Sequence, residues 1–391
     1  MCPPAARGRF PSRDGSRRPP LAGVCARVRL LAGLAPREAL LERVHQIDDL
    51  CPRWSRRRNH LLAGHLLLDG LHQPLAVLVT VLFWTELGRG ELLDQLLREV
   101  RPVAVIHLAF VMDAVRTGVL DRDRMWQINV AGTARVMEAV TEANRDWPMV
   151  EKFIFMSSVA AYGPDLTRPA TEDSQLAAHT YVYGVHKMEA DRVVQQRSPA
   201  LRGCSVYILR PHIFAGASVD NYFMEAFRGI PGGTSKRAAR MREKGTRLPC
   251  MLPSGTEYLL NKIQFVHTDD VARLVSHILK KIEPEAQRIT VLNVAGRGSP
   301  MTYEQCVQAA NAKLLRVPSK KIFELVLRFL WNRKISTIPP DVAPYMTSDT
   351  VMDTTRLQEF LGAEYKSVIR YPIADAFAEC FKQEAVAAIK P

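Results

Sequence analysis

The sequence lacks the features that mark secreted and metal-binding proteins. Its seven cysteines are scattered, and no two have the C-x-x-C spacing of a zinc site or the pattern of a disulfide framework. The Arg-rich start has no apolar stretch followed by a small-residue cleavage site, which argues against a secretory signal. We therefore predict a cytoplasmic protein without a metal site.

The sequence also lacks an apolar run long enough to cross a membrane. The longest run, Leu75–Trp84, would span about 15 Å as a helix, which is about half of a bilayer core. Its β-branched and aromatic residues instead suit a strand that is buried in a sheet. We expect no transmembrane span.

Lysine is absent before Lys152, and this absence divides the chain in two. Residues 1–90 hold 14 Arg, no Lys and 7 acidic residues, so they carry about half of the net charge of +13. The rest of the chain has the charge balance of an ordinary globular protein, so we expect no nucleic-acid partner. We interpret residues 1–90 as an atypical Arg-rich segment that is poorly ordered or non-native.

From residue 91 onward, helical and extended patterns alternate. Helical spacing of apolar residues and short, uniformly apolar runs follow one another along the chain. The segments are, in order, Glu91–Val100, Val103–Leu108, Met125–Asn144, Glu151–Met156, Tyr181–Gln195 and Cys204–Leu209. This alternation predicts an α/β fold with a Rossmann-like, doubly wound parallel sheet whose N-terminal strands are missing or replaced. We assign residues 91–216 to the catalytic core, and 217–391 to a smaller α/β substrate region interleaved with the end of the core.

Three residues of this core form a plausible acid–base set. Tyr183 and Lys187 are four residues apart, so a helix places both on one face. A nearby ammonium lowers the pKa of a phenol, and the hydroxyl of Ser158, at the end of the preceding strand, can bond an oxygen that is being oxidised or reduced. Such a set moves a proton while a hydride leaves carbon, and the hydride acceptor must be a cofactor.

The order of the motifs resembles that of the extended short-chain dehydrogenase/reductases, the NAD-dependent epimerase/dehydratase group. The motifs are IHLAF (106–110), NVAGT (129–133), MSSVAAYG (156–163), YGVHK (183–187), LRPHIFAG (209–216), QFVHTDDVA (264–272), VLNVAGRGSPMTYEQ (291–305) and MDTTRLQEFLG (352–362). The resemblance covers about residues 91–385. It implies hydride transfer to NAD or NADP, with Ser158, Tyr183 and Lys187 as the catalytic residues.

The same resemblance implies further roles. Lys187 would lower the pKa of Tyr183 and bond the cofactor ribose. The residues implied at the cofactor are Leu108, Ala109, Phe110, Asn129, Tyr183, Lys187, Pro211 and Ile213. The helices that contain Asn129 and Tyr183 would form a homodimer.

One family element is missing. Family members begin with a strand, a G-x-x-G-x-x-G loop that approaches the cofactor pyrophosphate, and a helix. No three glycines before His107 have this spacing. Three interpretations of residues 1 to about 88 follow. They are a foreign or wrongly translated segment, or a divergent start that has lost dinucleotide binding. In the third interpretation they bind the cofactor in an unconventional way, and Leu75–Phe83 replaces the central strand. In each case we expect NAD to bind poorly or not at all, because loss of that strand leaves neighbouring backbone groups unpaired.

The substrate implied by the resemblance is a nucleotide sugar. The candidates for binding its diphosphate are the basic residues Lys236, Arg237 and Arg240. The alternative interpretation of this basic stretch is a solvated loop without a ligand. Nucleotide-sugar members commonly carry an Arg where this chain has Ile263. A steroid- or lipid-type hydroxyl substrate and a non-catalytic relative that cannot bind cofactor are therefore the alternatives.

The apolar stretch Phe323–Trp331 allows two interpretations. It is a buried helix of the substrate region, or it forms an apolar entrance to the substrate site or a peripheral contact with a membrane surface.

Overall fold

The computed structural model describes residues 62–67, 76–81, 90–112, 114–145, 149–281 and 289–387. The expectation of an atypical start therefore falls largely outside the described residues. Within these ranges, no helix combines the length and apolar character needed to cross a membrane.

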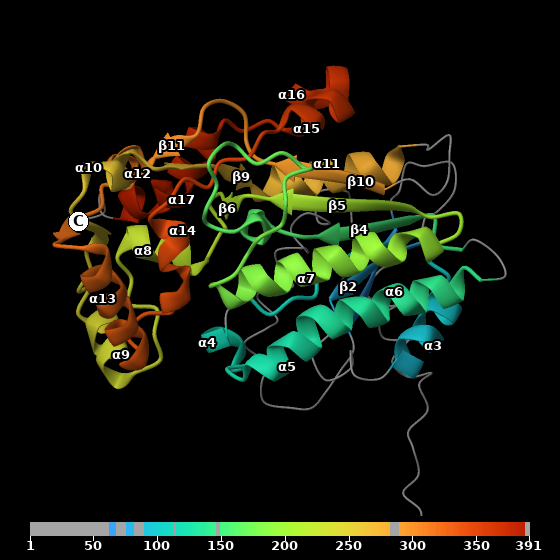
Figure 1. Ribbon diagram of the computed structural model, residues 1–391, viewed down its shortest axis with the longest axis horizontal. Helices are drawn as coiled ribbons and strands as arrows, with labels where there is room; N and C mark the ends of the chain where they lie inside the picture. The colour runs from blue at the N-terminus through green and yellow to red at the C-terminus, as the bar shows by residue number, and fades with distance from the viewer. Residues whose placement is uncertain are drawn as a thin grey trace, which may run out of the picture.

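A six-stranded sheet forms the centre of the molecule (Figure 1). Its strands are, in spatial order, β1 (Leu62–Leu67), β2 (Ala76–Val81), β3 (Ala104–His107), β4 (Lys152–Met156), β5 (Ser205–Pro211) and β10 (Ile289–Val294). β1 runs antiparallel to β2, and all other neighbours are parallel. β3 and β5 are buried along their whole length, as strands covered on both faces must be.

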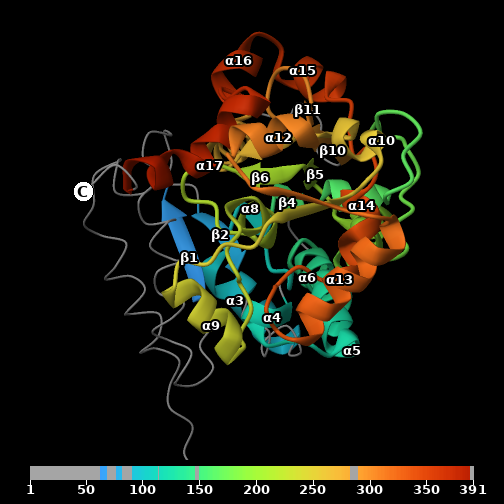
Figure 2. The ribbon, with the colours of Figure 1, turned by 90° about the vertical axis from the view of Figure 1, so that its left-hand side faces the viewer.

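Helices cover both faces of the sheet, which confirms the predicted doubly wound α/β fold (Figures 1 and 2). One face carries α3 (Gly90–Val100), α6 (Gly132–Ala143) and α7 (Val182–Arg197). Their apolar residues, such as Leu97, Val140 and Val194, form one core with the strands beneath them. The other face carries α11 (Thr268–Lys280), α15 (Thr355–Leu361) and α16 (Tyr365–Val368), which close a second core. Burial of these two apolar layers is the main force that holds the sheet between its helices.

The place beside β3 is filled by a strand. β2 pairs with β3 in parallel, with Val79 opposite Ile106. The apolar run Leu75–Phe83 thus supplies a partner strand for β3, as the third alternative for the N-terminal segment required. The cofactor grip of that alternative stays a prediction. Residues 68–75 and 82–89, on either side of β2, lie outside the described ranges.

The remaining elements connect the core to the substrate region. Short helices and turns of the core are α4 (Ala114–Thr117), α5 (Arg122–Trp126), the π-helical turn η1 (Gln127–Ala131), η2 (Val159–Tyr162) and η3 (Ser198–Ala200). The later elements are β6 (Ile213–Ala215), α8 (Tyr222–Arg228), α9 (Lys236–Glu243), β7 (Cys250–Pro253), α10 (Thr256–Leu260), β8 (Lys262–Ile263), β9 (Phe265–His267), β11 (Met301–Thr302), α12 (Tyr303–Ala309), β12 (Leu314–Val317), α13 (Lys320–Asn332), η4 (Pro340–Val342), α14 (Ala343–Met346), η5 (Gly362–Glu364) and α17 (Ile373–Ala387). An aromatic core around Phe227, Phe265 and Phe377 joins α8, β9 and α17. It attaches this region to the carboxyl ends of the central strands.

Candidate active site

The carboxyl ends of β3 and β4 carry two of the predicted motifs. After β3, Leu108 is exposed, Ala109 is buried and Phe110 is half-buried. After β4, the chain continues into Ser157 and Ser158, which are both buried. Open α/β sheets bind their ligands outside this edge of the sheet.

The two serines have different partners. The hydroxyl of Ser157 donates to Oδ2 of Asp191 at 2.6 Å, so it is held inside the fold. Ser158 caps η2 by accepting from the backbone N–H of Ala160, at 3.2 Å, and its hydroxyl also bonds the side chain of Tyr183. Of the two, Ser158 is therefore the serine that meets the predicted tyrosine.

Tyr183 lies in the first turn of α7 and is half-buried beside Ser158. Burial raises the pKa of Tyr183 to about 12, and the hydrogen bond with Ser158 opposes this rise. The phenol is therefore protonated at neutral pH, and it can donate a proton as an acid.

Lys187 is bound to the end of β4. It is 4% exposed, and its Nζ donates to the backbone oxygen of Met156 at 2.6 Å. Burial lowers the pKa of Lys187 to about 7, and Asp191 opposes this fall. The structure therefore differs from the expectation that Lys187 lowers the pKa of Tyr183. The reason is geometric: the ammonium faces the end of β4, and its nitrogen is 5.8 Å from the centre of the Tyr183 ring.

Phe110 covers the ammonium on the cleft side. The centre of its ring lies 3.6 Å from Nζ of Lys187, which is the closest cation–π contact of this amine. The same ring meets Tyr183 edge-on, with the ring centres 5.6 Å apart. Phe110 thus touches both predicted catalytic residues on α7.

A buried polar network beneath the site was missed by sequence reasoning. Arg210, 1% exposed, makes a bidentate ion pair with Asp191 at 2.9 and 3.0 Å and donates to the hydroxyl of Tyr162 at 2.8 Å. Tyr162 in turn donates to Asn293 at 2.7 Å. Asp191 follows Lys187 by one helical turn and Tyr183 by two, and this spacing is the sequence signal that could have predicted the network. The network ties α7, η2, β5 and β10 together.

Asn129 is a positioning residue. It is fully buried in the π-helical turn η1, where its amide accepts from the N–H of Val111 at 2.7 Å and donates to the same residue's carbonyl at 3.0 Å. In the same motif, Thr133 bonds His107 of β3 at 3.0 Å. The side chain of Asn129 is therefore occupied in fixing the segment that follows β3, and π-helical turns are frequent at functional sites.

Gly184 allows η2 to approach α7. A Cβ at this position would lie 2.8 Å from the hydroxyl of Tyr345 and 2.9 Å from the carbonyl of Ala160. These two atoms bond each other at 2.9 Å. The glycine next to Tyr183 thus has a steric reason, since it lets the turn that follows Ser158 lie against the helix.

The other predicted site residues are dispersed. Pro211 ends β5 in the buried sheet, and Ile213 is half-buried in β6. Lys236, Arg237 and Arg240 lie exposed on α9, at the end of the molecule that carries the substrate region (Figure 1). Ile263 is 2% exposed in β8. Within the described ranges, no three His, Cys, Asp or Glu side chains are grouped as a metal site would require.

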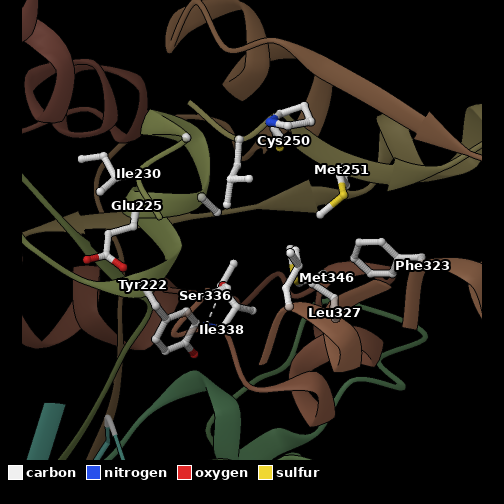
Figure 3. A pocket seen from close by; sticks show the side chains of 15 residues that line it. Tyr222, Glu225, Ile230, Cys250, Met251, Phe323, Leu327, Ser336, Ile338 and Met346 are labelled. Atoms are coloured by element: carbon white, nitrogen blue, oxygen red, sulfur yellow. Dashed lines mark hydrogen bonds between the residues drawn. The ribbon is translucent and has the colours of Figure 1, made fainter. Parts of the chain in front are cut away.

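A cavity of about 40 Å³ lies between α8, β7 and α13 (Figure 3). Its apolar lining includes Met251, Phe323 and Leu327, and Glu225 lies at its wall, where its carboxylate accepts from Thr337 at 2.8 Å. Tyr222 lines the cavity and shares a 2.5 Å hydrogen bond with Tyr181. The ring of Tyr181 is 5.5 Å from that of Tyr183. Tyr181 thus lies between the cavity and Tyr183, bonded to Tyr222 on one side and packed near the ring of Tyr183 on the other.

A model of the NAD-dependent epimerase/dehydratase family matches residues 37–295. The chain belongs to this family. The match begins well before residue 91, where the resemblance seen in the sequence begins. It therefore includes β1, β2 and the residues between them.

Two curated relatives match shorter segments. The UDP-glucose 4-epimerase of Erwinia amylovora is 31% identical over 147 residues, which is 36% of this chain and 42% of the relative. An uncharacterised protein of Sinorhizobium fredii is 26% identical over 152 residues, which is 39% of this chain and 32% of the relative. The chain therefore spans less than half the length of the curated relatives that it matches.

Solved structures of family members share the fold. The UDP-glucose 4-epimerase of Thermotoga maritima has a TM-score of 0.54 at 15% identity, over 88% of this chain and 96% of that one. The UDP-Glc/GlcNAc 4-epimerase of Campylobacter jejuni has a TM-score of 0.51 at 18% identity, over 77% of this chain and 83% of that one. At these identities the likeness concerns the Rossmann-type architecture.

Proposed function

We propose that this protein is an NAD(P)-dependent epimerase, dehydratase or dehydrogenase that acts on a nucleotide sugar through proton transfer at Tyr183. The observation that carries the proposal is the hydrogen bond between Ser158 and Tyr183 at the carboxyl ends of the central strands, with Lys187 one turn further along α7. The family supports a nicotinamide cofactor.

Lys187 and the residues after β3 support a role in holding such a cofactor. Lys187 is a buried ammonium with one backbone acceptor, at 2.6 Å, so it has N–H donors to spare for ribose hydroxyls. Leu108, Ala109 and Phe110 would line the same crevice. When bound, the nicotinamide accepts or returns the hydride that no side chain can take.

The side chains then divide the remaining work. Ser158 is placed to bond the substrate oxygen, and Tyr183 to give a proton to that oxygen or remove one from it. For Tyr183 to act as a base, its pKa must fall from about 12 toward the working pH. We propose that Lys187 leaves the Met156 carbonyl and turns toward the phenol, because a closer ammonium stabilises the phenolate.

A hydroxylated apolar substrate is the second candidate. The cavity beside Tyr222 is lined mainly by aliphatic and aromatic side chains, and the position of Ile263 offers no charge to a diphosphate. Such a lining favours a ring or alkyl group. The proposed diphosphate contacts of Lys236, Arg237 and Arg240 would have to come from the exposed face of α9.

A substrate panel separates the two candidates. The full chain, at millimolar NAD or NADP, is incubated with UDP-hexoses and UDP-hexuronic acids, and separately with 3-hydroxysteroids. Products are identified by chromatography, and NADH formation is followed at 340 nm. Conversion of a UDP-sugar supports the main proposal, whereas NADH formation with steroids alone supports the second. No conversion of either class would refute both.

We further propose a cytoplasmic homodimer that forms through α6 and α7. The reduced state of the buried Cys204, Cys250, Cys306 and Cys380 supports a reducing compartment. Beside these helices, Leu120 and Trp126 are 63% and 40% exposed, which suits an interface. Light scattering on the purified protein tests the dimer, and a monomeric mass at micromolar concentration would contradict it.

A further inference from the structure

Helix α13 presents apolar and cationic residues to the outside on one face. Ile322, Leu325 and Phe329 are 41%, 64% and 50% exposed. Their spacing of three and four residues places them in one stripe along the helix. The opposite face is anchored, because Phe323 and Leu327 are at most 2% exposed and line the cavity of Figure 3. The exposed stripe is therefore the outer side of a firmly packed helix.

Positive charge surrounds this stripe. The basic residues of the stretch are Lys320, Lys321, Arg328, Arg333 and Lys334, all of which are exposed, and Glu324 is its one acidic residue. The guanidinium of Arg333 lies 5.3 Å from the ring centre of Phe329. Long basic side chains beside apolar ones are typical of helices that lie in a membrane interface.

A second basic helix adjoins the first. The N–H of Ser235, the cap of α9, donates to the carbonyl of Lys334 at 3.0 Å, and the N–H of Gly233 donates to that of Ile335 at 2.9 Å. α9 adds its own exposed basic residues, among them Lys236, Arg237 and Arg240. Both helices lie at the end of the molecule that is on the left in Figure 1 and faces the viewer in Figure 2. The charge is thus concentrated on one end.

We propose that the outer face of α13, with the basic residues of α9 beside it, docks on the surface of a bilayer that contains anionic lipids. Acyl chains would take up the apolar stripe, and lipid phosphates would pair with the lysines and arginines around it. A second copy of this chain is a poorer occupant, since a two-fold contact would bring two surfaces of the same positive charge together. The proposal does not depend on the proposed catalytic function.

Vesicle co-sedimentation with the full chain tests this docking. We expect the protein to sediment with vesicles of equal parts phosphatidylglycerol and phosphatidylcholine, and to stay in solution with phosphatidylcholine alone. The double variant Leu325→Ser/Phe329→Ser should weaken binding by at least tenfold. Both replaced side chains are exposed, so the unfolding midpoint should stay unchanged.

A matched pair of single variants gives the control. Ile322→Ser should weaken vesicle binding severalfold, whereas Ile289→Ser, at the start of β10 and equally exposed at 42%, should leave it unchanged. Equal binding to both vesicle types, or full binding by the double variant, would overturn the proposal. A change of oligomeric mass in the double variant, without a change in vesicle binding, would also overturn it and would assign the stripe to self-association.

Discussion

Replacing Lys187 with Met should make the folded protein more stable and catalytically inactive. Lys187 is buried, has Asp191 one turn away on α7, and lies over the ring of Phe110. A methionine of similar length can occupy the same space without a charge. Stability and activity therefore change in opposite directions in this variant.

The magnitude follows from the pKa of the amine. Burial lowers the pKa of Lys187 from 10.5 to about 7. A fall of this size corresponds to about 5 kcal/mol of stability lost while the amine is charged in both states. The Met156 carbonyl loses its donor in the variant, which costs about 1–2 kcal/mol. The difference is a net gain of about 3–4 kcal/mol in the free energy of unfolding while the amine is charged, and of about 3 kcal/mol near pH 7, where half of the buried amine is already neutral.

The dependence on pH has a definite sign. Between about pH 7 and pH 10 the folded chain binds fewer protons at this site than the unfolded chain. The cost of burying Lys187 therefore falls as pH rises. The difference in free energy of unfolding between Lys187→Met and the parent shrinks toward zero near about pH 9.

Denaturant unfolding of both proteins from pH 6 to pH 9 measures this difference. Lys366→Met is the matched control, because Lys366 is exposed on α16, and it should leave stability unchanged at every pH. A Lys187→Met variant that is less stable than the parent at pH 6–7, or a difference that stays constant with pH, would refute the reasoning.

Three further variants test the surroundings of the site. Phe110→Ala should tighten NAD binding by about tenfold in calorimetry, because removal of the ring frees the Lys187 ammonium from a cation–π contact, which is worth about 2 kcal/mol when desolvated. Phe110→Leu keeps bulk over the amine and should tighten NAD binding less. Weaker NAD binding by Phe110→Ala would show that the ring itself supports the cofactor. Gly184→Ala should lower the free energy of unfolding by about 1–3 kcal/mol, since the clash with Ala160 and Tyr345 outweighs a gain in helix propensity of about 1 kcal/mol. A more stable variant would contradict the close approach of η2 to α7. Asp191→Asn should lower the free energy of unfolding by about 3–5 kcal/mol, because Arg210 stays charged in the core without its ion-pair partner. Asp173→Asn, the control, breaks the exposed contact with Arg356 and should lower it by at most about 1 kcal/mol. Equal losses in denaturant unfolding would argue against the buried pair.

Apolar periodicity predicted the core elements closely. The run Val103–Leu108 became β3 (Ala104–His107), and Tyr181–Gln195 became α7 (Val182–Arg197). Met125–Asn144 was predicted as one helix, and the structure interrupts it with the π-helical turn that holds Asn129. Periodicity cannot reveal such a turn, because the bond that Asn129 makes from it joins a segment 18 residues away.

The directions of the catalytic side chains could not be read from the motifs. The resemblance singled out Ser158 in the motif MSSVAAYG, but the bond that holds Ser157 to Asp191 could not be read from the motif. Likewise, the four-residue spacing places Tyr183 and Lys187 on one helix face, but Phe110 and the Met156 carbonyl, from two strands, set the direction of the ammonium. Such contacts join segments that are distant in sequence.

The N-terminal segment was predicted with its first strands missing or replaced, since no glycine loop could be found upstream. The strand β2 fills the place beside β3, and the family match extends back to residue 37. The absence of the glycine triad remains a sequence fact, and weak NAD binding remains our prediction; a micromolar dissociation constant in calorimetry would contradict it.

Turnover by Tyr183→Phe tests the central claim most directly. The variant keeps the ring that packs against Phe110 and removes only the hydroxyl that bonds Ser158. We predict that, at millimolar NAD, the rate of substrate conversion falls by at least about a hundredfold while NAD affinity is unchanged. Tyr181→Phe, which loses a hydrogen bond to Tyr222 outside the proton path, should keep most of the rate. Undiminished turnover by Tyr183→Phe would contradict the assignment of proton transfer to this residue.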